Sequence, residues 1–425
     1  MAEGLGLLII CAAGGRDALG PVPPVRPADE HSASLDWKTV HRAPNGRDEW
    51  YRVAYTTPTL WTGREGSGMK EGMEHALADT FIYDVAVIGA GPAGVQAAIS
   101  AWHQGRMVLV LDAGAVSQRK GRAYWAKSVA IEDAPGLPPL TGPKLRRQLH
   151  GLLTSRASGE AAQPRIALVG AYVLQMRREG DVFAVVASLG PLRHGAVESL
   201  GTFRARRVVI ASGFEDGWPE IEVEPGQRML ERHRTAFRYA GNENGWHLCI
   251  RCDGHLHRGG HFALLGVGDS IYEASLGAQD FASRITILTN GRPHGLSDAQ
   301  LRQAGQRELR IDTRPIARHL GEGTLLRGVV FTDGEELRAD GFLVDEGLTP
   351  NTQFLAEFKL ARNLDGLLRT GEDGAALRAD GQPEPGLYVA GDLVAGQRKL
   401  IAAAMASGQD AGLGASDSLR EWQEP

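Results

Sequence analysis

The stretch Asp84-Val85-Ala86-Val87-Ile88-Gly89-Ala90-Gly91-Pro92-Ala93-Gly94 decides the fold class of this chain of 425 residues. A buried strand of a parallel sheet is predicted from Tyr83 to Ile88, because an apolar run of four residues follows Asp84. Three glycines follow with the spacing G-x-G-x-x-G, and helical spacing continues as far as Trp102. A second apolar run, Met107 to Leu111, ends in Asp112. Strand, glycine turn, helix and strand in this order predict a βαβ unit.

Each glycine of this turn has a physical task if the unit binds a dinucleotide. Gly89 allows the tight turn, Gly91 lets the backbone approach a pyrophosphate, and Gly94 lets the helix pack closely on the sheet. The helix that begins at Pro92 and Ala93 directs its N-terminal N–H groups toward the phosphates. Asp112 follows the next strand, where an acid accepts hydrogen bonds from a ribose. The sequence therefore predicts a dinucleotide site here.

Several further strands are expected on either side of the middle of the chain. Short alternating strands are predicted around Arg165–Val169, Val182–Ser188 and Thr202–Arg206, and the last leads into an apolar run before Gly213. Near the C-terminus, Gly386-Leu387-Tyr388-Val389-Ala390-Gly391-Asp392 predicts a short strand that ends in Gly-Asp.

A second glycine turn occurs later in the chain. A strand is predicted over His261–Gly266, a helix from Ser270 to Phe281 and another strand from Ile285 to Leu288. The candidate nucleotide-binding residues of this turn are Gly266, Gly268, Asp269 and Ser270. The third fingerprint position is Ile271, whose branched side chain is expected to hinder close packing of helix on strand.

Cys249-Ile250-Arg251-Cys252-Asp253-Gly254 lies between the two turns, and Cys11 is the one further cysteine. Two cysteines with this spacing can form a small, reversible disulfide. A zinc site that adds His255 and His257 is an alternative, although these two histidines are closer in sequence than zinc ligands usually are. A structural disulfide is a further alternative. It is disfavoured because the chain is expected to be cytoplasmic, where such bonds do not persist unless they are catalytic.

The bulk composition limits the possible partners. Hydrophobic residues make up 43%, charged residues 23%, and the net charge is −5. These values predict a globular protein and give no indication of nucleic acid or an anionic membrane as partner. The apolar run from Gly4 to Ala13 is too short to span a bilayer.

The segment 1–80 is expected to be disordered, or to result from a start codon assigned too early, with Met69 or Met73 as the true start. It carries no sustained period of 2 or 3.6, so whether residues 1–72 are translated or ordered stays open. The alternative is a small subdomain built around four aromatic residues: Trp50, Tyr51, Tyr55 and Trp61.

These motifs together resemble the low-molecular-weight thioredoxin reductase family over about residues 83 to 412. In family order, the resemblance rests on the Gly89–Gly94 turn, Asp133-Ala134-Pro135-Gly136, the Cys-x-x-Cys-Asp-Gly run, the turn at 266–270, Gly347-Leu348-Thr349-Pro350-Asn351-Thr352 and the Gly391-Asp392 strand end. It implies an α/β protein with two Rossmann-like (three-layer ββα) nucleotide-binding domains, the second inserted into the first. Residues 81–213 and 340–425 would bind FAD, and residues 214–339 would form the NAD(P)-binding-like domain that carries the dithiol and rotates against the first.

The resemblance also implies roles for single residues. Cys252 would face the flavin, Cys249 would exchange with an external disulfide, and Asp253 would be the acid/base for the thiol proton. Asp392 would bind the ribityl chain of FAD, and Lys399 would belong to the same cofactor site. The implied partner is a thioredoxin-like protein or a small disulfide or dithiol, and the implied assembly is a homodimer.

One departure from the family affects the electron donor. Thr289 and Asn290 stand where NADPH-linked members carry a basic run that holds the 2′-phosphate, and Arg284 and Arg292 are the possible substitutes. Three functions therefore stay open. The first is a disulfide reductase that uses NADPH or NADH, the second a flavin dithiol oxidase or ferredoxin-linked reductase without a nicotinamide site, and the third a zinc-stabilised flavoprotein that acts as a binding or sensor module.

Overall fold

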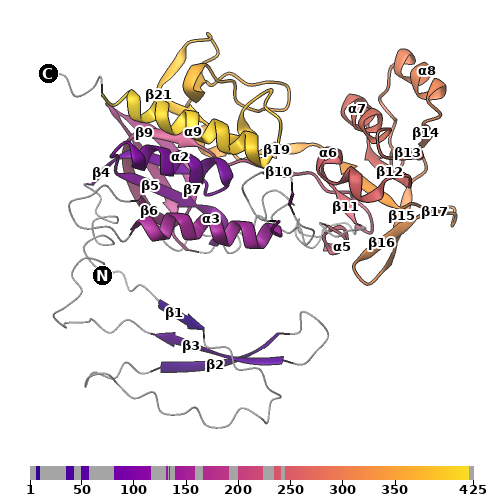
Figure 1. The fold of residues 1–425 in the computed structure, drawn as a ribbon, viewed down its shortest axis with the longest axis horizontal. Helices are drawn as coiled ribbons and strands as arrows, with labels where there is room; N and C mark the ends of the chain where they lie inside the picture. The colour runs from indigo at the N-terminus through magenta and orange to yellow at the C-terminus, as the bar shows by residue number, and fades with distance from the viewer. Residues whose placement is uncertain are drawn as a thin grey trace. The chain divides into compact units, whose positions relative to one another are not determined.

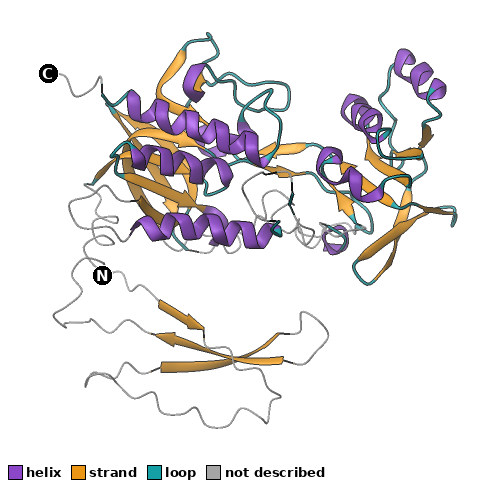
Figure 2. Ribbon diagram, in the orientation of Figure 1, coloured by secondary structure: helices purple, strands orange, loops and turns teal. Residues whose placement is uncertain are grey.

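The computed structural model divides the chain into two units, Met1–Ser67 and Gly68–Pro425. The structure describes residues 6–9, 35–42, 49–56, 81–115, 131–132, 134, 139–157, 166–190, 200–223, 234–240 and 245–420 (Figures 1 and 2). Met69, Met73, Trp61 and most of the predicted Asp133–Gly136 motif lie outside these residues.

The first unit contains a three-stranded antiparallel sheet in the order β1-β3-β2. Its strands are β1 (Gly6–Ile9), β2 (Leu35–Arg42) and β3 (Glu49–Thr56). These strands differ from the predicted lack of regular structure. Trp50, Tyr51 and Tyr55, which suggested a small subdomain, all fall within β3.

The larger sheet of the second unit has eight strands and is built from two separate parts of the chain. Its parallel core has the order β21-β9-β4-β5-β6, and β20 and the β7–β8 hairpin extend it. The strands are β4 (Ile82–Ile88), β5 (Val108–Asp112), β6 (Ile166–Gly170), β7 (Tyr172–Glu179), β8 (Val182–Ser188), β9 (Leu200–Ile210), β20 (Ala375–Leu377) and β21 (Pro383–Val389). The predicted strands are thus present, while β7 and β20 were not predicted.

Helices cover one face of this sheet, as Figure 2 shows, and form one layer of its core. They are α2 (Pro92–His103), α3 (Gly142–Ala157) and α9 (Ile401–Asp417). The apolar side chains of the parallel strands alternate between the two faces, so that Val85 and Val87 pack toward the helices and Ala86 and Ile88 pack toward β7 and β8.

The smaller sheet has five parallel strands in the order β11-β18-β12-β13-β14. They are β11 (Trp246–His247), β12 (His261–Gly266), β13 (Arg284–Leu288), β14 (Arg310–Asp312) and β18 (Gly341–Asp345). An antiparallel sheet accompanies them, with β15 (Ile316–Glu322), β16 (Leu325–Phe331) and β17 (Glu336–Arg338). The helices are α5 (Arg234–Arg238), α6 (Ile250–Asp253), α7 (Gly268–Ala278) and α8 (Asp298–Gln306). The predicted fold class is confirmed, with the second domain inserted into the first.

Two antiparallel segments join the sheets, β10 (Phe214–Asp216) and β19 (Leu348–Pro350). The hydroxyl of Ser212 donates to the carbonyl oxygen of Asn351 over 2.6 Å, and the Asn351 amide donates back to the Ser212 carbonyl over 3.1 Å. Because β18 pairs with β12, the chain leaves the smaller sheet after Asp345, and the predicted boundary at residue 340 is too early.

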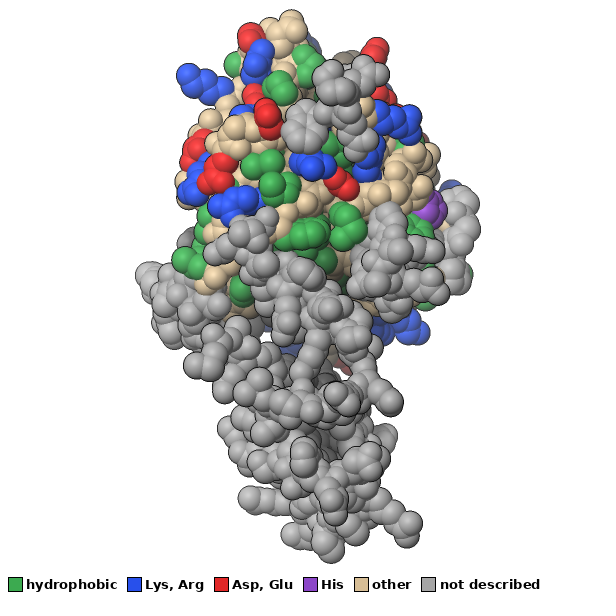
Figure 3. Space-filling view, turned by 90° about the vertical axis from the view of Figure 1, so that its left-hand side faces the viewer, with side chains coloured by type: hydrophobic (Ala, Val, Ile, Leu, Met, Phe, Trp, Pro, Cys, Tyr) green, Lys and Arg blue, Asp and Glu red, His purple; other side chains and the backbone are tan. Residues whose placement is uncertain are grey.

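None of the described helices is long and apolar enough to cross a membrane. The described residues also contain several short 3-10 turns. The turns are η1 (Ala113–Ala115), η3 (Gly254–His257), η4 (Gln353–Leu355), η5 (Glu372–Gly374) and η6 (Gly391–Leu393). On the face drawn in Figure 3, acidic and basic side chains are interspersed among the described residues. That distribution matches the absence of a strong net charge in the sequence.

Candidate functional site: a glycine turn and a disulfide in one pocket

The first glycine turn has the close approaches that its sequence predicts. Gly89 has φ +103°, and a side chain there would overlap the carbonyl of Ala211 at the end of the neighbouring strand. A side chain at Gly94 would overlap the carbonyl of Gly89, so only glycine lets α2 begin this close to β4. Gly91 is the N-cap of α2, and neither a capping side chain nor an acidic residue occupies this helix start. The helix N-terminus therefore faces the pocket with its own N–H groups.

Asp112 lies at the end of β5 beside this turn. Its carboxylate accepts from the backbone N–H of Ala90 and of Gly114, each over 3.3 Å. Two side chains of α3 approach the same carboxylate: Arg146 donates to it over 3.2 Å, and His150 Nε2 lies 3.5 Å away. Burial lowers the pKa of His150 more than the neighbouring carboxylate raises it. Neither α3 residue was predicted, because nothing near Asp112 in the sequence points to a helix so far along the chain.

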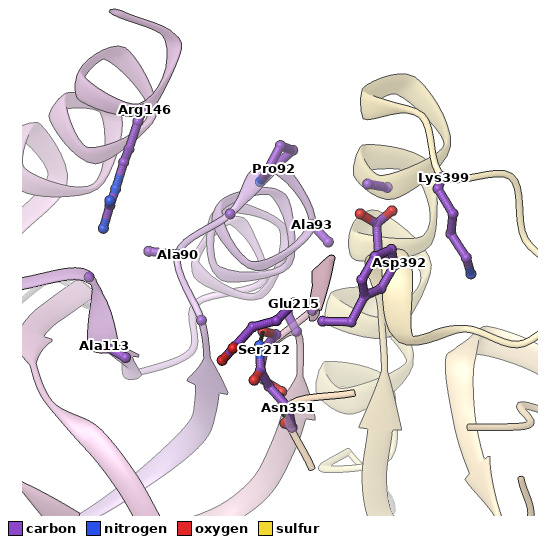
Figure 4. Close-up of a pocket in the computed structure, with 18 of the residues that line it drawn as sticks. Ala90, Pro92, Ala93, Ala113, Arg146, Ser212, Glu215, Asn351, Asp392 and Lys399 are labelled. Carbon is purple, nitrogen blue, oxygen red and sulfur yellow. Dashed lines mark hydrogen bonds between the residues drawn. The ribbon is translucent and has the colours of Figure 1, made fainter. Parts of the chain in front are cut away.

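The C-terminal Gly-Asp motif forms the opposite side of the pocket. Figure 4 shows Asp392 and Lys399 on one side and Arg146 on the other, with the turn from Ala90 to Ala93 between them. The N–H of Gly391 donates to the Ser407 hydroxyl of α9 over 2.9 Å. The Lys399 ammonium donates to the carbonyl oxygen of Val394 over 2.8 Å. All three predicted residues, Gly391, Asp392 and Lys399, thus line the pocket of the first glycine turn.

Cys249 and Cys252 are joined as a disulfide with a Cα–Cα distance of 5.3 Å. Cys249 is the N-cap of α6, and its sulfur accepts from the backbone N–H of Cys252 over 3.2 Å. Both cysteines and Asp253 line the same pocket as Gly89, Gly91 and Asp392. The structure therefore brings the dithiol motif and the predicted FAD motifs to one cavity.

The zinc alternative finds no support in this arrangement. The two sulfurs are bonded to each other, and His257 directs its Nε2 at His247. Among the described residues, no group of three or more His, Cys, Asp and Glu side chains is arranged to hold a metal ion.

A buried chain of polar side chains begins at Asp253, which lines the same pocket as the disulfide. Asp253 Oδ2 lies 3.1 Å from His247 Nδ1, and His247 Nε2 lies 3.0 Å from His257 Nε2. His247 was given no role from its sequence position, and His257 was considered only as a zinc ligand. The sequence signal that could have pointed to them is the position of one histidine before the cysteine pair and the other after it.

The second glycine turn is built differently from the first. Here Gly268 has φ +79°, whereas the corresponding Gly91 has φ −74°. The N–H of Gly268 donates to the carbonyl oxygen of His294 over 2.9 Å. A side chain at Gly295 would come within 3.3 Å of Gly268, so the loop after β13 packs directly on the turn.

The other predicted residues of the second turn are bonded within the protein. Asp269 accepts from the Gln300 amide over 2.8 Å, and the Ser270 hydroxyl donates to Asp345. Arg292 pairs with both carboxylate oxygens of Glu346 over 2.6 and 2.5 Å. Arg284, the other possible phosphate ligand, donates to His261 over 3.0 Å.

Ile271 does not hinder packing as predicted. Its side chain is 1% exposed and belongs to the core of the smaller domain. It packs against Gly266, where an added side-chain carbon would come within 3.2 Å of it. Because Gly266 has no side chain, the branched residue finds room over the strand.

Known proteins resemble most of this chain. One of the subunits of alkyl hydroperoxide reductase in Pseudomonas aeruginosa is 25% identical over 377 residues, which cover 85% of this chain and 62% of that protein. NADH dehydrogenase of Bacillus subtilis is 26% identical over 350 residues, which cover 81% of this chain and 60% of that protein. The chain thus spans about three fifths of the length of these curated relatives.

The structural comparison supports the fold. Thioredoxin reductase from Streptococcus pyogenes superimposes with a TM-score of 0.64 at 19% identity, covering 80% of this chain and 99% of that one. The sequence pattern of the family described as pyridine nucleotide-disulphide oxidoreductase matches residues 83–408. Because this match includes both glycine turns and the cysteine pair, the chain belongs to the pyridine nucleotide-disulphide oxidoreductase family.

Proposed function

We propose that this protein is an FAD-dependent thiol–disulfide oxidoreductase whose Cys249–Cys252 pair exchanges electron pairs between bound flavin and an external disulfide or dithiol. One observation carries the proposal: the disulfide lines the same pocket as the Gly89–Gly94 turn, Asp112 and Asp392. A redox-active dithiol needs a two-electron partner within reach, and this cavity supplies room for one.

The residues of the pocket fit FAD, which members of the family use together with NAD(P)H. The glycine turn and the start of α2 would hold the pyrophosphate, Asp112 the adenosine ribose and Asp392 the ribityl chain. Arg146 is placed to orient Asp112. When bound, FAD would supply a two-electron acceptor and donor.

The chain's own residues would carry out the thiol chemistry. In the proposed assignment Cys249 exchanges with the external partner, Cys252 faces the flavin side, and Asp253 accepts and returns the proton of a thiol. Arg251 is exposed and lies between the two cysteines in sequence. A positive charge in that position favours the thiolate, which is the form that attacks a disulfide.

In this structure the N–H of Gly268 and the guanidinium of Arg292 already bond to the protein, so a dinucleotide at the second glycine turn would have to displace these contacts. A nicotinamide nucleotide is still the first electron donor to test, because the family uses one. The bond from Gly268 to His294 favours a second candidate, a flavin dithiol oxidase or ferredoxin-linked enzyme that does without it.

A thioredoxin-like protein, or a small disulfide or dithiol, is the partner that this chemistry would accept. One relative is named as part of an alkyl hydroperoxide reductase and one solved structure as a thioredoxin reductase, which supports a protein disulfide as partner. We extend the proposal to a homodimer located in the cytoplasm. Size-exclusion chromatography with light scattering tests the assembly.

Anaerobic titration of the purified, FAD-loaded protein with a dithiol tests the proposed function. Wild type and Cys11→Ser should show loss of the oxidised flavin spectrum, while Cys249→Ser and Cys252→Ser should not. Full flavin reduction in either single mutant of the pair would refute the proposed electron path. Stoichiometric zinc that survives dialysis would support the binding-module hypothesis instead.

A further inference from the structure

Three titratable side chains form a buried chain that begins at Asp253, the residue after Cys252, in the pocket that the disulfide also lines. Asp253 of α6, His247 of β11 and His257 of η3 are 7%, 3% and 7% exposed. The contacts of 3.1 Å and 3.0 Å between them are both within hydrogen-bond range. The order is Asp253, His247, His257, with the carboxylate at the end nearest to Cys252 in sequence.

The contact between the two imidazoles limits where protons can lie between the rings. Two ring nitrogens 3.0 Å apart need one N–H and one bare nitrogen between them. If Asp253 is ionised, His247 donates from Nδ1 to it and accepts at Nε2 from His257. Both rings are then neutral. One additional proton can reside on the carboxylate or on one ring. If both rings were charged, both facing Nε2 atoms would carry N–H groups and no hydrogen bond could form between them.

The surroundings hold His257 in this orientation. Its ring lies edge-on to Phe262 of β12, with centroids 5.5 Å apart. A side chain at Gly341 of β18 would come within 2.9 Å of the ring. Neither neighbour titrates, and the nearby Arg251 and His255 are exposed. The other charged or titratable residues that line the pocket are Asp112, Arg146, Tyr172, Glu215, Asp392 and Lys399.

We propose that His247 and His257 are positioning residues that extend Asp253 into a three-member proton store for the dithiol. This inference rests on the proposed thiol–disulfide exchange. It assigns a task to two buried histidines that the exchange itself does not require.

The proton store balances the exchange with a disulfide RSSR. The Cys249 thiolate, whose proton has passed to solvent, attacks one sulfur, and the S–S bond breaks to release a first thiolate RS⁻. Cys252 passes its proton to Asp253 and attacks Cys249 Sγ, which breaks the mixed disulfide and releases a second RS⁻. The stored proton then protonates this second thiolate, and the first takes one from solvent. The dithiol loses two electrons to RSSR, and two RSH form.

The test measures the thiolate itself rather than turnover. In a Cys249→Ser background, the FAD-loaded protein is treated with iodoacetamide from about pH 5 to about pH 10, the range that spans imidazole and thiol titration. Mass spectrometry then gives the alkylation rate of the Cys252 peptide. Because a proton moved from Cys252 to the store does not leave the protein, a fraction of thiolate should persist at low pH as a plateau.

Two variants shorten the store while keeping a polar group in place, His247→Asn and His257→Gln. Each should lower the plateau by about tenfold, which corresponds to one unit in the relative pKa of donor and acceptor. The rate near pH 10 should be unchanged, which shows that access to Cys252 is intact. His255→Gln, an exposed histidine of the same turn, is the matched control and should leave the whole profile unchanged.

An unchanged plateau in both variants would overturn the inference, and a plateau lost only in His247→Asn would remove His257 from it. A merely structural role would change the rate at every pH, or the flavin content, and this result also counts against the store. Failure of the proposed function would appear differently, as wild type that holds no flavin or exchanges no disulfide.

Discussion

We expect selectivity between NADPH and NADH to depend on Arg292. Its guanidinium makes two bonds to Glu346, over 2.6 and 2.5 Å, and a third to the carbonyl oxygen of Thr289 over 3.0 Å. Thr289 and Asn290 carry no charge, and Arg284 is engaged by His261. A 2′-phosphate would therefore have to take Arg292 away from Glu346.

The expected difference in affinity between NADPH and NADH follows from that exchange of partners by Arg292. Hydrogen bonds to charged groups contribute about 1.5–3 kcal/mol each. Two such bonds to a phosphate would replace two to a carboxylate, so the net gain is close to zero. Glu346 would also lose its partner, and burial already raises the pKa of this carboxyl more than Arg292 lowers it. We expect NADPH and NADH to differ in affinity by less than about tenfold, or 1.4 kcal/mol.

The assay is anaerobic flavin reduction by each nucleotide over a range of concentrations. Glu346→Gln removes the charge that holds Arg292 and should raise the preference for NADPH by about tenfold. Glu336→Gln breaks an exposed ion pair with Arg338 and serves as the matched control. A wild type that prefers NADPH by about a hundredfold or more would refute the reasoning. Reduction by neither nucleotide would place the oxidase or ferredoxin-linked function first.

Three further outcomes are expected. Gly91→Val should block the pyrophosphate and yield protein without flavin absorbance, whereas Gly151→Val, where an added carbon meets nothing within 4 Å, should stay yellow. Cys252→Ser should leave Cys249 free to trap a mixed disulfide with a partner, which mass spectrometry detects and Cys249→Ser should abolish. Burial lowers the pKa of His319 more than Glu222 raises it, so its neutral form contributes stability above its unfolded pKa of about 6.5 that is lost as the pH falls through the lower folded value. The urea midpoint of wild type should therefore drop between about pH 7.5 and pH 5, and His319→Gln should show a smaller drop.

The parts of the site that could be predicted from sequence are those that one local stretch encodes. The Gly89–Gly94 turn, its flanking strands and Asp112 follow each other within one βαβ unit, so their spacing alone predicts their arrangement. The cysteine pair is equally local. The prediction that the pair can face the flavin site came from the family resemblance, because strands far apart in sequence form the pocket.

The residues that were missed all depend on pairing between distant segments. Arg146 reaches Asp112 only because α3 lies beside the first turn, and no periodicity in the sequence encodes that contact. The pairing of β18 with β12 moved the domain boundary for the same reason. The partner of Arg292 could not be predicted either, since Glu346 follows β18 and meets the arginine only once that strand has joined the sheet.

Ile271 departs from the glycine fingerprint as the sequence indicates, but its predicted effect on helix packing was wrong. A branched residue in place of the third glycine was expected to disturb the packing of helix on strand, yet it fills the core against Gly266.

Ile271→Ala should therefore open a cavity and cost about 2–5 kcal/mol of unfolding free energy, without improving nucleotide binding. Ile82→Ala, at a site 41% exposed, is the control and should cost about 0.5 kcal/mol. Urea unfolding and a nucleotide titration of the same samples measure both effects. If Ile271→Ala kept its stability and bound NADPH about tenfold more tightly, the side chain would be a block in a working site. Unchanged nucleotide affinity together with the loss of stability would confirm that Ile271 serves as a core residue only.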